Sequence, residues 1–120
     1  MTLQTMIDEI KNRPDYYQAG MILAHNGVVR GTSRDGRSVS GLKVSVDHEK
    51  LVEIIEKNIH TPGIIDIKVW INEEKNLAVG DDVMFLVVAG DIRENVLSTL
   101  EKTLNAIKST VTSKTEYFTR

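Results

Sequence analysis

The chain has 120 residues, of which 41% are hydrophobic and 27% charged, and this composition is typical of one globular domain. A chain of this size buries roughly two-thirds of the surface that its unfolded form exposes, so it needs no disulfide or structural metal. It has no cysteine, which excludes cysteine nucleophiles, cysteine-ligated zinc and iron–sulfur clusters and suits a reducing cytoplasm, where we expect the protein. The net charge of −2 favours neither nucleic acid nor anionic lipid, and no apolar run approaches the roughly 18 residues of a membrane span. We therefore expect one domain over residues 1–120, with no nucleic-acid or membrane partner.

The first half of the chain contains patterns for one helix and two strands. Apolar residues at helical spacing predict a helix over Leu3–Ile10, and Pro14 ends it. Gly20–Arg30 is rich in apolar and β-branched residues, which predicts a strand. Alternating apolar and polar residues predict a second strand over Val39–Val46. The polar stretch between these strands, Gly31–Ser38, is typical of a hairpin tip.

A second helix and two further strands follow. Asp47 is placed to cap a helix whose apolar stripe ends near residues 61–63. Alternation over Ile65–Ile71 predicts a third strand, and residues 72–82 are turn-prone. The continuous apolar run Val83–Ala89 predicts a fourth strand, either central in the sheet or covered by a second subunit.

The last helix completes the predicted fold. Asp91 and Glu94 have the spacing of a capping box, and the apolar stripe over residues 92–107 predicts a long helix, followed by a mixed polar and basic tail. The element order predicts an α+β fold in two layers, with helices packed on one side of a largely antiparallel sheet.

Positive charge gathers in the loop after the first strand. This loop holds Arg30, Arg34 and Arg37 against Asp35, and its glycines allow a close approach of the backbone. Such a loop suits phosphate or carboxylate, although it lacks the GK[ST] sequence of a P-loop. The alternative is a solvated hairpin tip.

The C-terminal segment carries a second excess of positive charge, which includes Lys108 and Lys114. A cation at the end of a helix is favoured by the helix dipole, so simple helix termination is the alternative explanation for Lys108. A lysine that is partly desolvated beside arginines can act as an acid–base or nucleophilic group near neutral pH.

The remaining candidates favour structural roles. His25, His48 and His60 share no metal-ligand spacing, so we expect no metal site. Trp70 lies on the polar face of its strand, where a tryptophan favours packing against a helix or a dimer contact.

The order of these features resembles the large, catalytic subunit of molybdopterin synthase. The resemblance runs from about Gly20 to Glu116 and comprises a strand ending in GVVR, a basic loop, the segment VGDDVMFLVVAGDIR, a long helix closed by IK, and a lysine before a glutamate. It implies an α/β hammerhead fold and a central homodimer with a small ubiquitin-like sulfur-carrier subunit at each end, a heterotetramer. It also implies a sulfurtransferase without cofactors. The Gly-Gly thiocarboxylate of the carrier would deliver sulfur to cyclic pyranopterin monophosphate and form the dithiolene of molybdopterin.

The resemblance also implies roles for individual residues. The positions that match, or lie near, the family's functional residues are Arg30, Arg34, Arg37 and Arg93 for substrate binding, and Lys108 and Lys114 for catalysis. Asn72 and Ile92 stand where the family has histidines. The alternative is therefore a non-catalytic paralogue that keeps the dimer and binds a ubiquitin-like partner or a phosphorylated ligand. A third possibility is a small phosphate-binding domain unrelated to pterins.

Helix geometry bears on two of these residues. Arg93 and Lys108 are 15 residues apart on one predicted helix, which separates them by roughly 22 Å. Both residues can serve one small substrate only if a second subunit supplies one of them, which predicts a homodimer with two equivalent sites.

Overall fold

The computed structural model describes residues 1–119 of the chain. In chain order the elements are α1 (Leu3–Lys11), the 3-10 turn η1 (Tyr16–Gln18), β1 (Met21–Val28), β2 (Val39–Val46), α2 (His48–Ile59), β3 (Ile64–Ile71), β4 (Leu77–Ala78), β5 (Asp82–Gly90), α3 (Arg93–Ala106), the π-helical turn η2 (Ile107–Val111) and β6 (Thr112–Phe118). Helices and antiparallel strands together make an α+β fold, as the sequence predicts.

The strands form two sheets of three, in the orders β1-β5-β3 and β4-β2-β6, and every pair is antiparallel. The predicted hairpin of β1 and β2 is wrong, because these strands belong to different sheets. An isolated bridge between Thr32 and Ser38, rather than a ladder of paired residues, joins the two sides of the loop. Alternation along a strand predicts which face is buried but not which strand lies beside it, and β1 pairs instead with the fully apolar β5.

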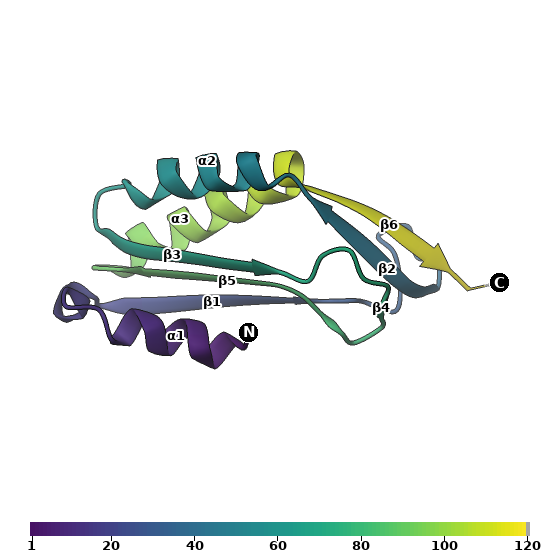
Figure 1. The fold of residues 1–120 in the computed structure, drawn as a ribbon, viewed down its shortest axis with the longest axis horizontal. Coiled ribbons are helices and arrows are strands. Elements are labelled where there is room, and N and C mark those ends of the chain that lie inside the picture. The colour runs from purple at the N-terminus through teal and green to yellow at the C-terminus, as the bar shows by residue number, and fades with distance from the viewer. Residues whose placement is uncertain (120) are drawn as a thin grey trace.

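The first sheet carries helices on both faces. Strand β5 is central, as predicted, and its residues alternate between two clusters of buried side chains. Phe85 and Val87 face Met6 of α1, whereas Leu86 faces Val96 of α3 on the side that α2 also covers. Figure 1 shows α2 and α3 above this sheet and α1 below it. The one-sided packing predicted from the element order therefore describes α2 and α3 but not α1.

Trp70 of β3 lies on the α1 side of this sheet. It is half-buried, and its ring centroid lies 4.8 Å from that of Phe85 on the central strand. Trp70 therefore packs within its own chain, against the cluster that α1 covers.

Side chains at the helix starts explain two of the helix boundaries. The hydroxyl of Thr2 accepts a hydrogen bond from the backbone N of Thr5, at 3.0 Å, and caps α1. Asp47 caps α2 as predicted. The predicted capping box of Asp91 and Glu94 is wrong, because α3 begins one residue later, with Ile92 as its N-cap. The Asp91 carboxylate instead accepts hydrogen bonds from the Ile92 backbone N and the Asn95 side chain.

The C-terminal segment is a strand, and the predicted polar tail is wrong for residues 112–118. Helix α3 widens into η2 and leads directly into β6, which pairs with β2 over most of its length. Strand β6 is an edge strand and carries mostly polar side chains, so it lacks the apolar alternation that marks a strand in a sequence. The two residues of β4 were also predicted as turn.

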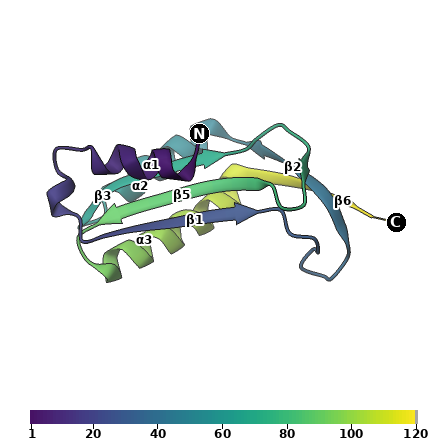
Figure 2. The same cartoon turned by 90° about the horizontal axis from the view of Figure 1, so that it is seen from below.

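The second sheet extends beyond the first, which gives the molecule extents of 52 × 25 × 23 Å (Figures 1 and 2). Val29, which follows β1, packs against Leu42, Val44 and Leu77 of this sheet and joins the two halves. None of the described helices is long and apolar enough to cross a membrane.

Candidate functional site

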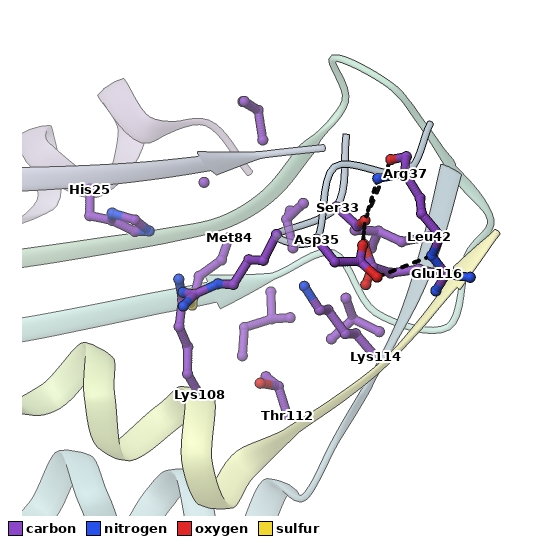
Figure 3. Close-up of a pocket in the computed structure, with 16 residues that line it drawn as sticks. His25, Ser33, Asp35, Arg37, Leu42, Met84, Lys108, Thr112, Lys114 and Glu116 are labelled. Carbon is purple, nitrogen blue, oxygen red and sulfur yellow. Dashed lines mark hydrogen bonds and ion pairs between the residues drawn. The ribbon is translucent and has the colours of Figure 1, made fainter. Parts of the chain in front are cut away.

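A pocket of about 580 Å³ lies where the two sheets meet, and its volume is in the range of small-molecule binding sites. Figure 3 shows its side chains converging from both sheets, the β1–β2 loop and η2. Its lining residues are His25, Gly27, Val28, Ser33, Arg34, Asp35, Arg37, Leu42, Val44, Ile71, Val83, Met84, Lys108, Thr112, Lys114 and Glu116.

Strand register positions the β6 side of the pocket. Lys114 pairs with Val44 of β2, and Glu116 pairs with Leu42. Residues two apart on a strand share a face, so these four side chains line the pocket together.

The π-helical turn η2 positions Lys108. Ile107 and Val111 are buried in the core and anchor the two ends of the turn, while Lys108 lines the pocket between them. A π-turn is a local widening that occurs often at functional sites. Lys108 therefore does more than close a helix, because the turn directs it towards the pocket, as Figure 3 shows.

Internal contacts shape the β1–β2 loop. The Ser33 hydroxyl donates to the Asp35 carboxylate, and Arg37 Nε lies 3.2 Å from the same carboxylate. Gly36 supplies the left-handed backbone conformation of the turn, with φ of 86°. The hydrogen bond from Ser33, followed by the charge of Arg37, lowers the pKa of Asp35 below its ordinary value. The Arg37 guanidinium also lies 3.7 Å from the centre of the Phe118 ring, so the loop rests on the end of β6.

The charge of the pocket suits an anionic ligand. Arg34, Arg37, Lys108 and Lys114 contribute four cations against the carboxylates of Asp35 and Glu116, so positive charge prevails locally in a chain of negative net charge. Among residues 1–119, no three His, Cys, Asp or Glu side chains are grouped so as to hold a metal ion.

His25 also lines the pocket, although no motif in the sequence predicts a functional role for it. It points from β1 toward the pocket, on the side where Lys108 lies (Figure 3). Burial of the ring and, to a smaller extent, the charge of Lys108 lower the pKa of His25 below its ordinary 6.5. One feature of the sequence does point to His25: it is a polar residue on the same face of an apolar strand as Leu23 and Gly27, and that face points inward.

The sequence model of the MoaE protein family matches residues 2–110, which is most of the chain. The chain belongs to the MoaE family. Membership in this family supports a role in molybdenum cofactor biosynthesis. A search of curated proteins found no match.

Solved structures share the MoaE fold with this chain. The chain is similar to a molybdopterin synthase from Staphylococcus aureus at 20% identity, covering 85% of this chain and 77% of the other, with a TM-score of 0.73. It is similar to molybdopterin cofactor biosynthesis protein E from Burkholderia multivorans at 16% identity, covering 99% and 86%, with a TM-score of 0.77. It is also similar to a chain of the complex of subunits 1 and 2 of molybdopterin-converting factor from Helicobacter pylori at 16% identity, covering 100% and 85%, with a TM-score of 0.72.

The six candidate residues transferred from the molybdopterin synthase resemblance divide into two groups. Four of them line the pocket, namely Arg34, Arg37, Lys108 and Lys114. Arg30 lies outside its lining, where its Nε donates to the Thr32 carbonyl at 2.8 Å. Arg93 begins α3, is 75% exposed and lies 3.8 Å from the Glu94 carboxylate. The match to the MoaE family includes Lys108 and ends before Lys114.

Proposed function

We propose that this protein is the catalytic subunit of a molybdopterin synthase, a sulfurtransferase that works in the cytoplasm. It would transfer sulfur from a small carrier subunit with a C-terminal Gly-Gly thiocarboxylate to cyclic pyranopterin monophosphate and so form the molybdopterin dithiolene. The observation that carries this proposal is a cationic pocket containing Lys108 and Lys114 in a chain of the MoaE family.

Substrate binding is assigned to the arginines. Arg34 and Arg37 carry planar guanidinium groups, which suit the oxygens of a phosphate. Arg37 is already oriented by Asp35 and Phe118, which reduces the ordering that binding would require. Arg30, outside the lining, contributes positive charge from the start of the same loop and holds the Thr32 carbonyl.

The chemistry is assigned to the two lysines. In each of two transfers the thiocarboxylate sulfur forms a bond to a pterin side-chain carbon, whose oxygen leaves, and water then hydrolyses the resulting thioester and frees the carrier as a carboxylate. Lys108 stabilises the oxyanion that forms when water adds to the thioester, or donates a proton to the departing oxygen. Lys114 supports this charge from β6, the strand that follows η2. No resident metal or cofactor is part of the proposal.

The proposed partners are the carrier subunit and a second copy of this chain. The Helicobacter pylori neighbour is a complex of two subunits, which supports a small partner for this chain. A homodimer is supported by Arg93, which lies at the start of α3, outside the pocket of its own chain. We propose that Arg93 serves the pocket of the neighbouring subunit.

The test is dithiolene formation from cyclic pyranopterin monophosphate by this protein with its thiocarboxylated carrier. The comparison is between wild type, Lys108→Ala and the control Lys57→Ala. Lys57 is an exposed lysine in the last turn of α2 and so matches Lys108 in its place near the end of a helix. We expect Lys108→Ala to lose about 100-fold or more in rate, the size of a lost acid–base or oxyanion contact, with an unchanged melting temperature. Lys57→Ala should retain the wild-type rate.

Two outcomes contradict the proposal. Equal rates for wild type and Lys108→Ala would remove Lys108 from the chemistry. A stable complex with the carrier but no turnover by the wild type would instead favour a non-catalytic paralogue. The exposed Ile92, which stands where the family resemblance implies a histidine, is the observation that favours this second candidate.

A further inference from the structure

The imidazole of His25 lines the pocket and has an unsatisfied nitrogen. Nε2 is buried and has no hydrogen-bond partner among the described residues. Buried polar groups are ordinarily hydrogen-bonded, because leaving one unpaired loses the hydrogen bonds that it makes in water. An unpaired nitrogen beside a ligand-sized pocket therefore indicates a hydrogen bond to a group on the ligand that binds there.

The local backbone makes room for this ring. Gly27 follows two residues later on the same face of β1, and a Cβ at that position would lie 3.3 Å from Nε2 of His25. A side chain at residue 27 would thus crowd the nitrogen, whereas glycine leaves the ring the space to turn Nε2 towards the pocket.

The charges around His25 favour its neutral form. From η2, Lys108 faces the ring, and from β5 the neighbours are Leu86, its partner in the strand register, and Met84, neither of which titrates. Burial and Lys108 both lower the pKa of His25, so the ring is uncharged at neutral pH.

A neutral imidazole offers something that the other basic side chains of the pocket lack. Lysine and arginine only donate hydrogen bonds, whereas an unprotonated imidazole nitrogen accepts one. The two carboxylates, on Asp35 and Glu116, lie at the opposite end of the pocket (Figure 3). At the end near Lys108, Nε2 of His25 is therefore an acceptor nitrogen, and the hydroxyl of Thr112 is a second acceptor there.

We propose that Nε2 of His25 accepts a hydrogen bond from an N–H or O–H group on the uncharged part of the ligand, so that His25 determines specificity while the cations hold the phosphate. This inference rests on the proposed function, because it takes cyclic pyranopterin monophosphate as the ligand. The polar ring system of such a ligand carries N–H and O–H groups of this kind.

The first test observes the nitrogen directly in the wild-type protein. Histidine is labelled with 15N, and the imidazole signals are recorded at pH 7.5 before and after addition of cyclic pyranopterin monophosphate. His25 is assigned from the signals that His25→Gln lacks. We expect an unprotonated Nε2 in the free protein, which shifts on binding and stays unprotonated. An Nε2 that gains a proton, or one that does not shift, would overturn the inference.

The second test measures ligand affinity in two variants. His25→Phe keeps a ring of similar size without an acceptor, and we expect it to bind the pterin about tenfold more weakly, the effect of one lost hydrogen bond. His25→Gln keeps an acceptor oxygen and should bind more tightly than His25→Phe, which separates hydrogen bonding from packing. Wild-type affinity in a folded His25→Phe variant would refute the inference while the proposed function stands. If the wild type does not bind the pterin, the proposed function itself fails, and this inference with it.

Discussion

The half-buried imidazole of His25 also links stability to pH. An unfolded chain titrates histidine near pH 6.5, whereas the folded chain binds this proton only at lower pH. Between these two pKa values the unfolded state holds more protons, so the free energy of unfolding falls as the pH drops below about 6.5.

We therefore predict that the wild type loses more thermal stability than His25→Gln between pH 7.5 and pH 5.5. The glutamine variant has no imidazole to protonate at this position. His60→Gln is the control, because His60 is an exposed histidine at the end of α2, and it should follow the wild-type curve. Parallel curves for wild type and His25→Gln would contradict the prediction. The measurement is the melting temperature by circular dichroism at each pH.

For single residues of the site, the sequence predicts charge more readily than burial. Arg34, Arg37, Lys108 and Lys114 were visible in the sequence as local excesses of cations, and the fold brings all four to one pocket. His25 was not visible, because its environment depends on where η2 places Lys108 against β1. A sequence pattern shows the spacing of residues along one helix or strand, whereas a pocket is formed by residues from several helices, strands and loops.

Among the elements, the short strand β4 depends on one close approach. A Cβ on Gly41 would collide with the carbonyl oxygen of Leu77, so glycine lets β4 lie against β2.

We predict that Gly41→Val lowers the free energy of unfolding by about 1–3 kcal/mol, because either strand must move to admit the side chain. Ser45→Val is the matched control, since Ser45 is an exposed residue of the same strand whose side chain makes no hydrogen bond within the described part of the chain. It should change stability by less than about 0.5 kcal/mol. Urea unfolding of the three proteins measures both effects. Equal midpoints for Gly41→Val and the wild type would show that β4 is free to move.

Elements with strong apolar patterns were predicted well, and polar ones were missed. The stripes of α1 and α2 and the continuous run of β5 each bury a face in the core, and each was found within a few residues. Strand β6 turns Lys114 and Glu116 to the pocket and leaves its edge open, so nothing in its composition required a strand. The polar residues of β6 that line the pocket are also the reason why the sequence pattern does not predict a strand there.

For the whole molecule, the distance between Arg93 and the pocket leads to a prediction about assembly. If Arg93 completes the site of a neighbouring subunit, a heterodimer of Arg93→Ala and Lys108→Ala chains has one site with both residues intact and one site with neither.

We predict that each variant homodimer is inactive in sulfur transfer, and that the heterodimer has about half the wild-type activity, because one of its two sites is intact. The heterodimer is obtained by co-expression with two different affinity tags and sequential purification. If Arg93 acts within its own chain, both sites of the heterodimer are damaged, and activity near zero would exclude the shared site. A wild type that is monomeric and active would exclude it as well.

The two sheets also have a mechanical consequence. No ladder joins a strand of one sheet to a strand of the other among residues 1–119, so their relative tilt is held by the side chains around Val29 and by loop contacts, such as the hydrogen bond from Glu74 N to Val44 O. The pocket lies between the two sheets, where they meet at an angle. A ligand that contacts both sheets therefore fixes their relative tilt, and the tilt depends on the size of the ligand. Leu42 and Val44 belong both to this joint and to the lining of the pocket, so a substitution at either position changes the contacts with a ligand and the tilt of the two sheets together.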